Sequence, residues 1–290
     1  MAAPQILFLH VNKVADQKVL KTEIERLLLA LRADLPLPHQ ITVFNHPYKG
    51  PAYDDGTIYI KFPFYKESPA SGKIVRKTAQ ASLPIALHEL SHQILETYIH
   101  HHFFNTAPQM IWAFYTRADD LYAQASLDFI ERTKGRTPYQ KMSAKKIAAH
   151  FLEMTTTALP FNEFLSDVIP TLFADDADTI YKSVSFGDED PRLHYRRFSH
   201  DDQNLDLEKL KGSEYDSSLP AKLWVWREVF QKNKRKPKPI RFGLLIQKII
   251  NATLAAFVES TDHFKHSPDL IQDPAKLNQT LIKHLRLEFP

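Results

Sequence analysis

The stretch from His88 to His92, H-E-L-S-H, constrains this chain more than any other, because its chemistry requires an α-helix. It follows directly on the apolar run Leu83–Leu87, and residues four apart in a helix share a face. Two imidazoles on one face can bind one zinc ion, and Glu89 beside them can act as a general base. The alternative is an amphipathic helix with a partly exposed histidine pair, which these five residues leave open.

Composition narrows the kinds of protein and of site. The chain has 290 residues, is 43% hydrophobic and 24% charged, and contains no cysteine. Disulfides and thiolate metal ligands are therefore excluded, so any metal must be held by His and carboxylates. A net charge of +3 gives no argument for nucleic acid or an anionic membrane as a partner. No run approaches 18 uninterrupted apolar residues, so we expect no membrane span.

Periodicity predicts a small α/β lobe before the His88–His92 helix. Strands are expected at residues 5–11, 41–44 and 57–62, a helix at 16–32, and a loop at 66–77. The strand at 57–62 is either an interior strand or an edge strand that pairs with an extended ligand. Ser82 is expected to cap the next helix, with Pro84 in its first turn, and the helix is expected to end near His100.

The rest of the chain predicts a mainly helical lobe. Helices are expected at 108–132, 144–157, 161–174, 218–231 and 240–258, with one or two more within 270–287, and turns at 175–204. The basic run Lys232–Lys238 lacks interleaved aromatic residues, which favours a solvated loop over a nucleic-acid contact. The expected class is α+β, with an N-terminal lobe at 1–100, a helical lobe at 101–290, and the site in a cleft between them.

A catalytic zinc site usually takes three protein ligands, so a third must lie elsewhere. Glu96 follows His92 by four, but one straight helix rarely wraps three ligands around an ion. The metzincin pattern fails because Leu95 and Tyr98 stand where it needs Gly and His. Asp119 and Asp120 weakly resemble part of the aspzincin motif. The fourth candidate is residues 162–167, N-E-F-L-S-D, in which Glu163 and Asp167 share a helical face.

This N-E-x-x-S-D segment, together with H-E-x-x-H, resembles the two zinc motifs of the gluzincin metallopeptidases, the thermolysin-like group. The resemblance implies a zincin-like fold in which His88, His92 and Glu163 bind Zn²⁺. It implies that Asp167 accepts a hydrogen bond from the distal nitrogen of His88, with Asn162 and Ser166 as supports. The two motifs are 70 residues apart, more than in thermolysin-like enzymes, so we interpret residues 93–162 as an insertion.

A second resemblance concerns the oxyanion that forms during peptide hydrolysis. Residues 214–224, E-Y-D-S-S-L-P-A-K-L-W, are similar to the gluzincin segment in which a Tyr or His precedes a turn into a helix. Tyr215 is then the expected oxyanion donor, with His200, His194 and Tyr195 as competitors. The G-x-M-E-N motif of gluzincin aminopeptidases is missing, which favours an endopeptidase or a different terminal anchor.

The sequence therefore predicts a zinc metallopeptidase that cleaves peptides or proteins through a water activated by Glu89. We expect neither a nucleic-acid partner nor a membrane partner. The sequence does not indicate an oligomeric state. The alternative is a catalytically inactive zincin-like protein that keeps the scaffold for binding or structure. Residues 1–5 lack a signal-peptide pattern, so the protein is either cytoplasmic or has lost a signal. Because many zinc peptidases are exported, we favour a secreted or periplasmic location.

Overall fold

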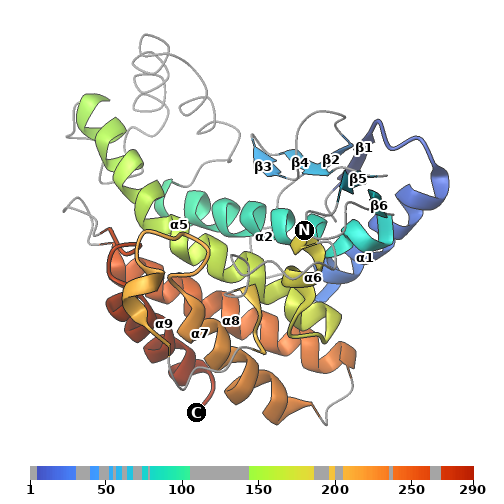
Figure 1. The fold of residues 1–290 in the computed structure, drawn as a ribbon. Helices are drawn as coiled ribbons and strands as arrows, with labels where there is room; N and C mark the ends of the chain where they lie inside the picture. The colour runs from blue at the N-terminus through green and yellow to red at the C-terminus, as the bar shows by residue number, and fades with distance from the viewer. Residues whose placement is uncertain are drawn as a thin grey trace.

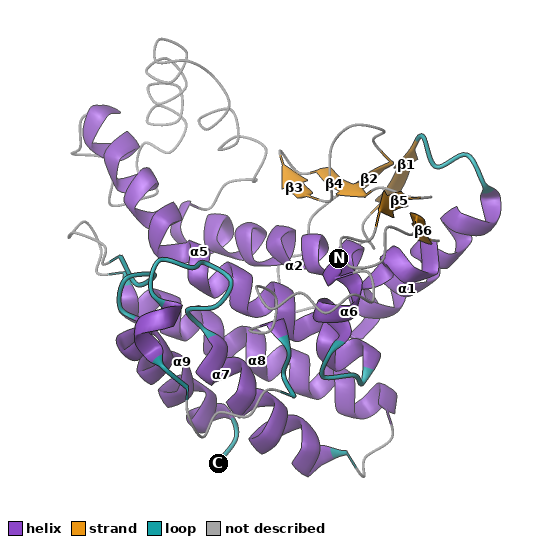
Figure 2. Cartoon of the chain, viewed as in Figure 1, coloured by secondary structure: helices purple, strands orange, loops and turns teal. Residues whose placement is uncertain are grey.

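A small sheet beside a larger helical body gives the mixed α+β class expected from the sequence (Figures 1 and 2). The computed structural model describes residues 5–30, 40–45, 52–54, 57–60, 64–67, 74–77, 79–104, 144–185, 196–199, 205–234, 238–261 and 269–290. The helix predicted at 108–132, including Asp119 and Asp120, lies outside these residues, as do His194, Tyr195 and His200. None of the described helices is both long and apolar enough to span a bilayer.

The sheet has four strands in the order β1 (Gln5–Leu9), β2 (Gln40–Asn45), β4 (Thr57–Ile60) and β3 (Ala52–Asp54). The first three are parallel, and β3 runs antiparallel to β4. The edge-strand prediction for residues 57–62 is therefore wrong, and the interior alternative is correct. The physical reason is that Ala52–Asp54 folds back and pairs with the outer side of β4, so β3 becomes the edge of the described sheet.

A two-stranded hairpin of β5 (Phe64–Glu67) and β6 (Ile74–Lys77) corrects the loop predicted at 66–77. Strands of four residues are too short to show a clear alternation of apolar and polar residues, and each of these two ends in two charged residues, as a loop often does.

Helix α1 (Val14–Ala30) connects β1 to β2 and packs through residues at helical spacing. Leu20, Ile24 and Leu27 are fully buried, whereas Leu29 on the opposite side is 84% exposed. This face belongs to the same cluster of buried hydrophobic residues as Ile41, Val43 and Ile58 of the sheet, all with no exposed surface.

Helix α2 (Ala79–Phe104) carries the H-E-x-x-H stretch through the centre of the molecule. It contacts α1, β3, β4, and the helices α5 (Ala144–Ala174) and α6 (Thr179–Ser185). The helix starts before Ser82, so the predicted cap is wrong: Ser82 is a buried residue within it, and Pro84 lies beyond the first turn. Tertiary packing stabilises such a buried helix and offsets the hydrogen bond that a proline removes.

Helix α5 merges the two helices predicted at 144–157 and 161–174 and retains Pro160 and Pro170 inside it. It ends where Asp175 adopts a left-handed backbone with φ of 59°, a conformation that Asp tolerates better than most residues. The turns predicted at 175–204 are wrong for Thr179–Ser185, which form α6. Its burial against α2 and α5 overrides its weak periodicity.

The C-terminal helices follow the prediction more closely. They are η3 (Leu207–Leu210), α7 (Leu219–Trp224), the π-helical η4 (Val225–Phe230), η5 (Gln231–Asn233), α8 (Lys238–Ser260) and α9 (Pro274–Glu288). Figure 1 shows α7, α8 and α9 beneath α5 and on the far side from the sheet. One cluster of buried hydrophobic residues extends from Val11 to Leu285 through α2 and α5. The division at residue 100 and the cleft stay predictions.

Candidate metal centre

His88, Glu89 and His92 lie on a face of α2 that is buried against α5. Residues 85–95 are all buried, so the ligand face belongs to a helix covered on every side. The side chains of the two histidines and Glu89 are 7–11% exposed. Within the helix, Ser91 donates its hydroxyl hydrogen to the carbonyl of Leu87 at 2.7 Å, which satisfies a polar group in the apolar interior.

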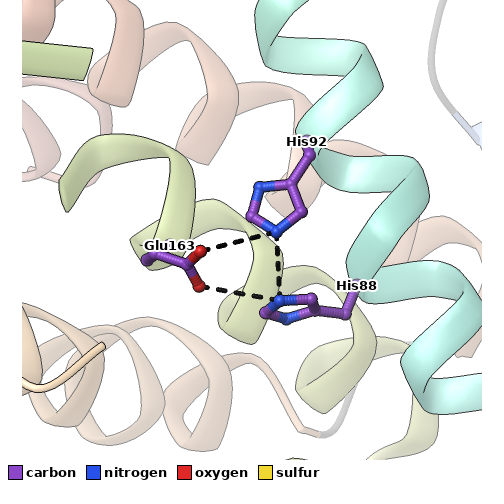
Figure 3. A group of neighbouring side chains, drawn as sticks. All are labelled: His88, His92 and Glu163. Carbon is purple, nitrogen blue, oxygen red and sulfur yellow. Dashed lines mark hydrogen bonds and ion pairs between the residues drawn. The ribbon is translucent and has the colours of Figure 1, made fainter. Parts of the chain in front are cut away.

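Glu163 reaches this face from α5, which packs alongside α2 over much of its length. Its Oε2 lies 3.6 Å from Nε2 of His88, and its Oε1 lies 3.6 Å from Nε2 of His92. The two Nε2 atoms are 3.1 Å apart. Figure 3 shows all three groups pointing toward one another.

This spacing suits a metal ion. Ligands about 2.0–2.1 Å from a tetrahedral zinc ion lie about 3.3 Å from one another, close to the three observed separations. Oε2 of Glu163 is buried and has no hydrogen-bond partner, which is costly unless a cation or donor meets it. The buried His-His-Glu group could therefore hold a metal ion, with the ligand set typical of catalytic zinc.

Two residues of α5 hold the far sides of the imidazole rings. Nδ1 of His88 lies 3.1 Å from Oδ1 of Asp167, and Nδ1 of His92 lies 3.0 Å from Oγ of Ser166. With the proton on each Nδ1, both Nε2 atoms present a lone pair to the metal position. The structure thus gives Ser166, expected only as a support, a specific partner.

Asp167 also pairs with two cations that the sequence reasoning did not identify. Its Oδ1 accepts a hydrogen bond from Nη2 of Arg196 at 2.5 Å, and its Oδ2 accepts one from Nζ of Lys222 at 2.7 Å. Both Asp167 and Lys222 are fully buried. The one sequence signal is that Lys222 lies between apolar residues in α7, where a lysine must find a partner.

Burial sets the protonation of the metal-free site. It lowers the pKa of His92 to about 4, with the charge of His88 adding to the effect, so His92 is a neutral ligand near pH 7. Burial also raises the pKa of Glu163 to about 7. For Asp167, burial would raise the pKa, but Arg196 and Lys222 outweigh it and hold the pKa well below its usual range.

If this group holds a metal ion, its affinity for zinc, used as the probe, should therefore depend on pH through Glu163. Below pH 7 the metal-free carboxyl is mostly protonated, so the metal must displace one proton, and the apparent affinity falls about fivefold from pH 7 to pH 6. Between pH 7 and 8 the change is smaller, because the carboxyl is already mostly ionised. Competition titrations against a zinc-binding dye at pH 6, 7 and 8 measure this, with Glu163→Gln as the variant that lacks the titrating group. Equal affinities at all three values would contradict it.

Tyr215 lies against the two cations that hold Asp167. Its ring centre is 4.6 Å from the guanidinium carbon of Arg196, and its carbonyl accepts a hydrogen bond from Nζ of Lys222 at 2.6 Å. Its pKa is raised by partial burial, then by the charges of Glu163 and Glu214, so the hydroxyl keeps its proton. The residue is 38% exposed.

Among the described residues, His88, His92 and Glu163 form the group of His and acidic side chains able to hold a metal ion. Asp119 and Asp120, the rival ligands, lie outside the described residues, as does the side chain of Glu96. The three residues predicted as ligands are thus brought together from two helices, although 70 residues separate His92 from Glu163 in sequence. Comparisons with protein families, with characterised proteins and with solved structures find no match.

Proposed function

We propose that this chain is a zinc-dependent metallopeptidase of the gluzincin type. The observation that carries the proposal is the position of Glu163, 3.6 Å from both histidine Nε2 atoms, with Asp167 one turn further along α5 and 3.1 Å from His88. Helix α5 thus supplies the third ligand, Glu163, and also Asp167, the carboxylate behind His88. Both stand in the order of the N-E-x-x-S-D motif. A buried site of two His and one Glu favours zinc among the common metals.

Glu89 supplies the proton chemistry in this proposal. When bound, the metal lowers the pKa of a coordinated water and polarises the substrate carbonyl. Oε2 of Glu89 lies 3.9 Å from Nε2 of His92, so the carboxylate stands beside the ligand set rather than within it. It accepts a proton from the attacking water as the oxygen–carbon bond forms. It then gives that proton to the leaving amine nitrogen as the carbon–nitrogen bond breaks.

Two further parts of the site act on the substrate. Tyr215, whose hydroxyl keeps its proton, donates a hydrogen bond to the oxyanion as it develops. The backbone of β3, at the edge of the described sheet and in contact with α2, pairs with the extended substrate chain. The substrate is a peptide or protein.

Metal analysis of Glu163→Ala tests the ligand set. We expect wild type to bind one zinc ion, and the variant to bind it more than about 100-fold less tightly, since even loss of an outer partner costs 10–100-fold. Isothermal titration with zinc measures both. Glu96→Ala is the matched control on the same helix as the histidines and should bind like wild type. Stoichiometric, tight zinc in Glu163→Ala would contradict the assignment and redirect it to Glu96, Asp119 or Asp120.

A further inference from the structure

Lys222 occupies an unusual position for a lysine. Its side chain has no exposed surface, and its ammonium lies between Oδ2 of Asp167 at 2.7 Å and the carbonyl oxygen of Tyr215 at 2.6 Å. The first acceptor stands behind a metal ligand, and the second belongs to the segment expected to supply the oxyanion donor. A buried ammonium is costly unless it is paired, so both contacts are strongly favoured.

A separate set of hydrogen bonds fixes the backbone next to Lys222. Asn278 of α9 accepts from the amide of Ala221 at 2.9 Å and donates to the carbonyl of Ser217 at 2.7 Å. Asn278 is itself buried. Ser217 and Ala221, which precede Lys222, are therefore both hydrogen-bonded to α9. The lysine side chain extends from this backbone toward α5.

Arg196 adds a second connection between the same two groups. It donates to Oδ1 of Asp167 and lies over the ring of Tyr215. Each cation that pairs with Asp167 therefore also contacts Tyr215, one at the backbone and one at the ring. Because Tyr215 is 38% exposed, it has less packing around it than a buried residue, and these two contacts restrain its position.

We propose that Lys222 is a positioning residue that couples the metal ligands to Tyr215. Asp167 orients His88, and Lys222 donates hydrogen bonds to both Asp167 and the Tyr215 carbonyl. The conformation of the Tyr215 segment is thereby linked to the positions of the histidine side chains. Metal binding that fixes His88 then also fixes residues 213–219, although none of these residues is a ligand. The catalytic consequence of this coupling rests on the proposed function, but the coupling itself does not.

Hydrogen exchange of the whole chain with and without zinc tests the coupling without a substrate. In wild type we expect zinc to slow exchange of the amides of residues 213–219 about fivefold or more, the lower end of ordinary coupling between sites. Amides of residues 277–285 in α9 are the control and should not respond. In Lys222→Met the zinc effect on residues 213–219 should be smaller than in wild type, because only the Arg196 connection between Asp167 and Tyr215 remains. The proposal would be overturned if zinc did not change exchange of residues 213–219 in wild type, or if it slowed that exchange equally in the variant.

Kinetics at saturating zinc then tests the route of action. Lys222→Met should lower kcat about tenfold or more with little change in KM, because displacement of Tyr215 affects the transition state. Combining it with Tyr215→Phe should give no greater loss than Tyr215→Phe alone, since the lysine acts through the tyrosine. Losses that multiply would show an independent structural role and refute the positioning role.

Two features keep these tests decisive. If Lys222→Met does not fold, the wild-type exchange experiment still decides the proposal, because residues 213–219 must respond to zinc in wild type. Wild type that binds zinc, protects residues 213–219 and cleaves no peptide would refute the peptidase and leave the coupling. Wild type that cleaves peptides while Lys222→Met matches it would refute the coupling and leave the peptidase.

Discussion

Glu89→Gln should abolish peptide cleavage while leaving the zinc content at the wild-type level. The amide keeps the size of the carboxylate but accepts no proton, and positioned acid–base groups contribute about 10²–10⁴-fold to such reactions. Glu89 lies beside the ligands and not among them, with Oε2 3.9 Å from Nε2 of His92, so the metal site stays intact. Cleavage of a fluorogenic peptide library, with zinc measured on the same preparation, gives both numbers.

Glu96→Gln is the matched control for this experiment. It makes the same change two turns further along α2 and should cleave like wild type. Cleavage by Glu89→Gln at the wild-type rate would refute the mechanism. A wild type that binds zinc tightly and cleaves nothing in the library would support the alternative, a zincin-like protein kept for binding or structure.

Asp167→Asn should be the most destabilising single change of charge in the described structure. Asp167 is fully buried and pairs with Arg196 and Lys222, and removing one member of a buried ion network typically costs about 3–5 kcal/mol. Glu259→Gln is a close control, because Glu259 also has two cationic partners, Lys283 and His284. Its side chain is 43% exposed, so we expect a loss below about 1 kcal/mol.

Urea unfolding of the metal-free proteins at several pH values measures this difference. The pKa of Asp167 is held below its usual range, so its contribution is fully present above about pH 4, the unfolded value. It is lost as the pH falls through the lower, folded pKa. The gap between wild type and Asp167→Asn should therefore be constant from pH 5 to 8 and shrink below pH 4. Equal stabilities at pH 7 would contradict the buried network.

Most helices and strands with a clear periodicity of apolar residues were predicted from the sequence. Elements that depend on packing against distant parts of the chain were missed. The spacing of Leu20, Ile24 and Leu27 gave α1, and alternating residues gave the parallel strands. The hairpin of β5 and β6 was missed because strands of four residues show little alternation, and the break expected between residues 157 and 161 is overridden by burial within α5. That β3 rather than β4 is the edge strand depends on which strand folds back, which no local pattern specifies.

The candidate site divides in the same way. His88 and His92 could be identified because helical spacing places them on one face, and Glu163 and Asp167 because their segment resembles the gluzincin motif; the structure brings these four together. Arg196 and Lys222 could not, since each depends on where a turn places one long side chain relative to a helix far away in sequence. Lys222 lies between apolar residues of α7, but this pattern does not indicate that Asp167 is the partner of its ammonium.

The burial of α2 has a consequence for how this chain tolerates change. From residue 85 to residue 95 every position is buried, so each one is occupied either by a packing residue or by a residue of the candidate site. A single residue inserted or deleted between His88 and His92 would rotate all later positions by about 100° relative to His88 and separate the two histidines onto different faces. We therefore expect residues 85–95 to tolerate only near-isosteric exchanges.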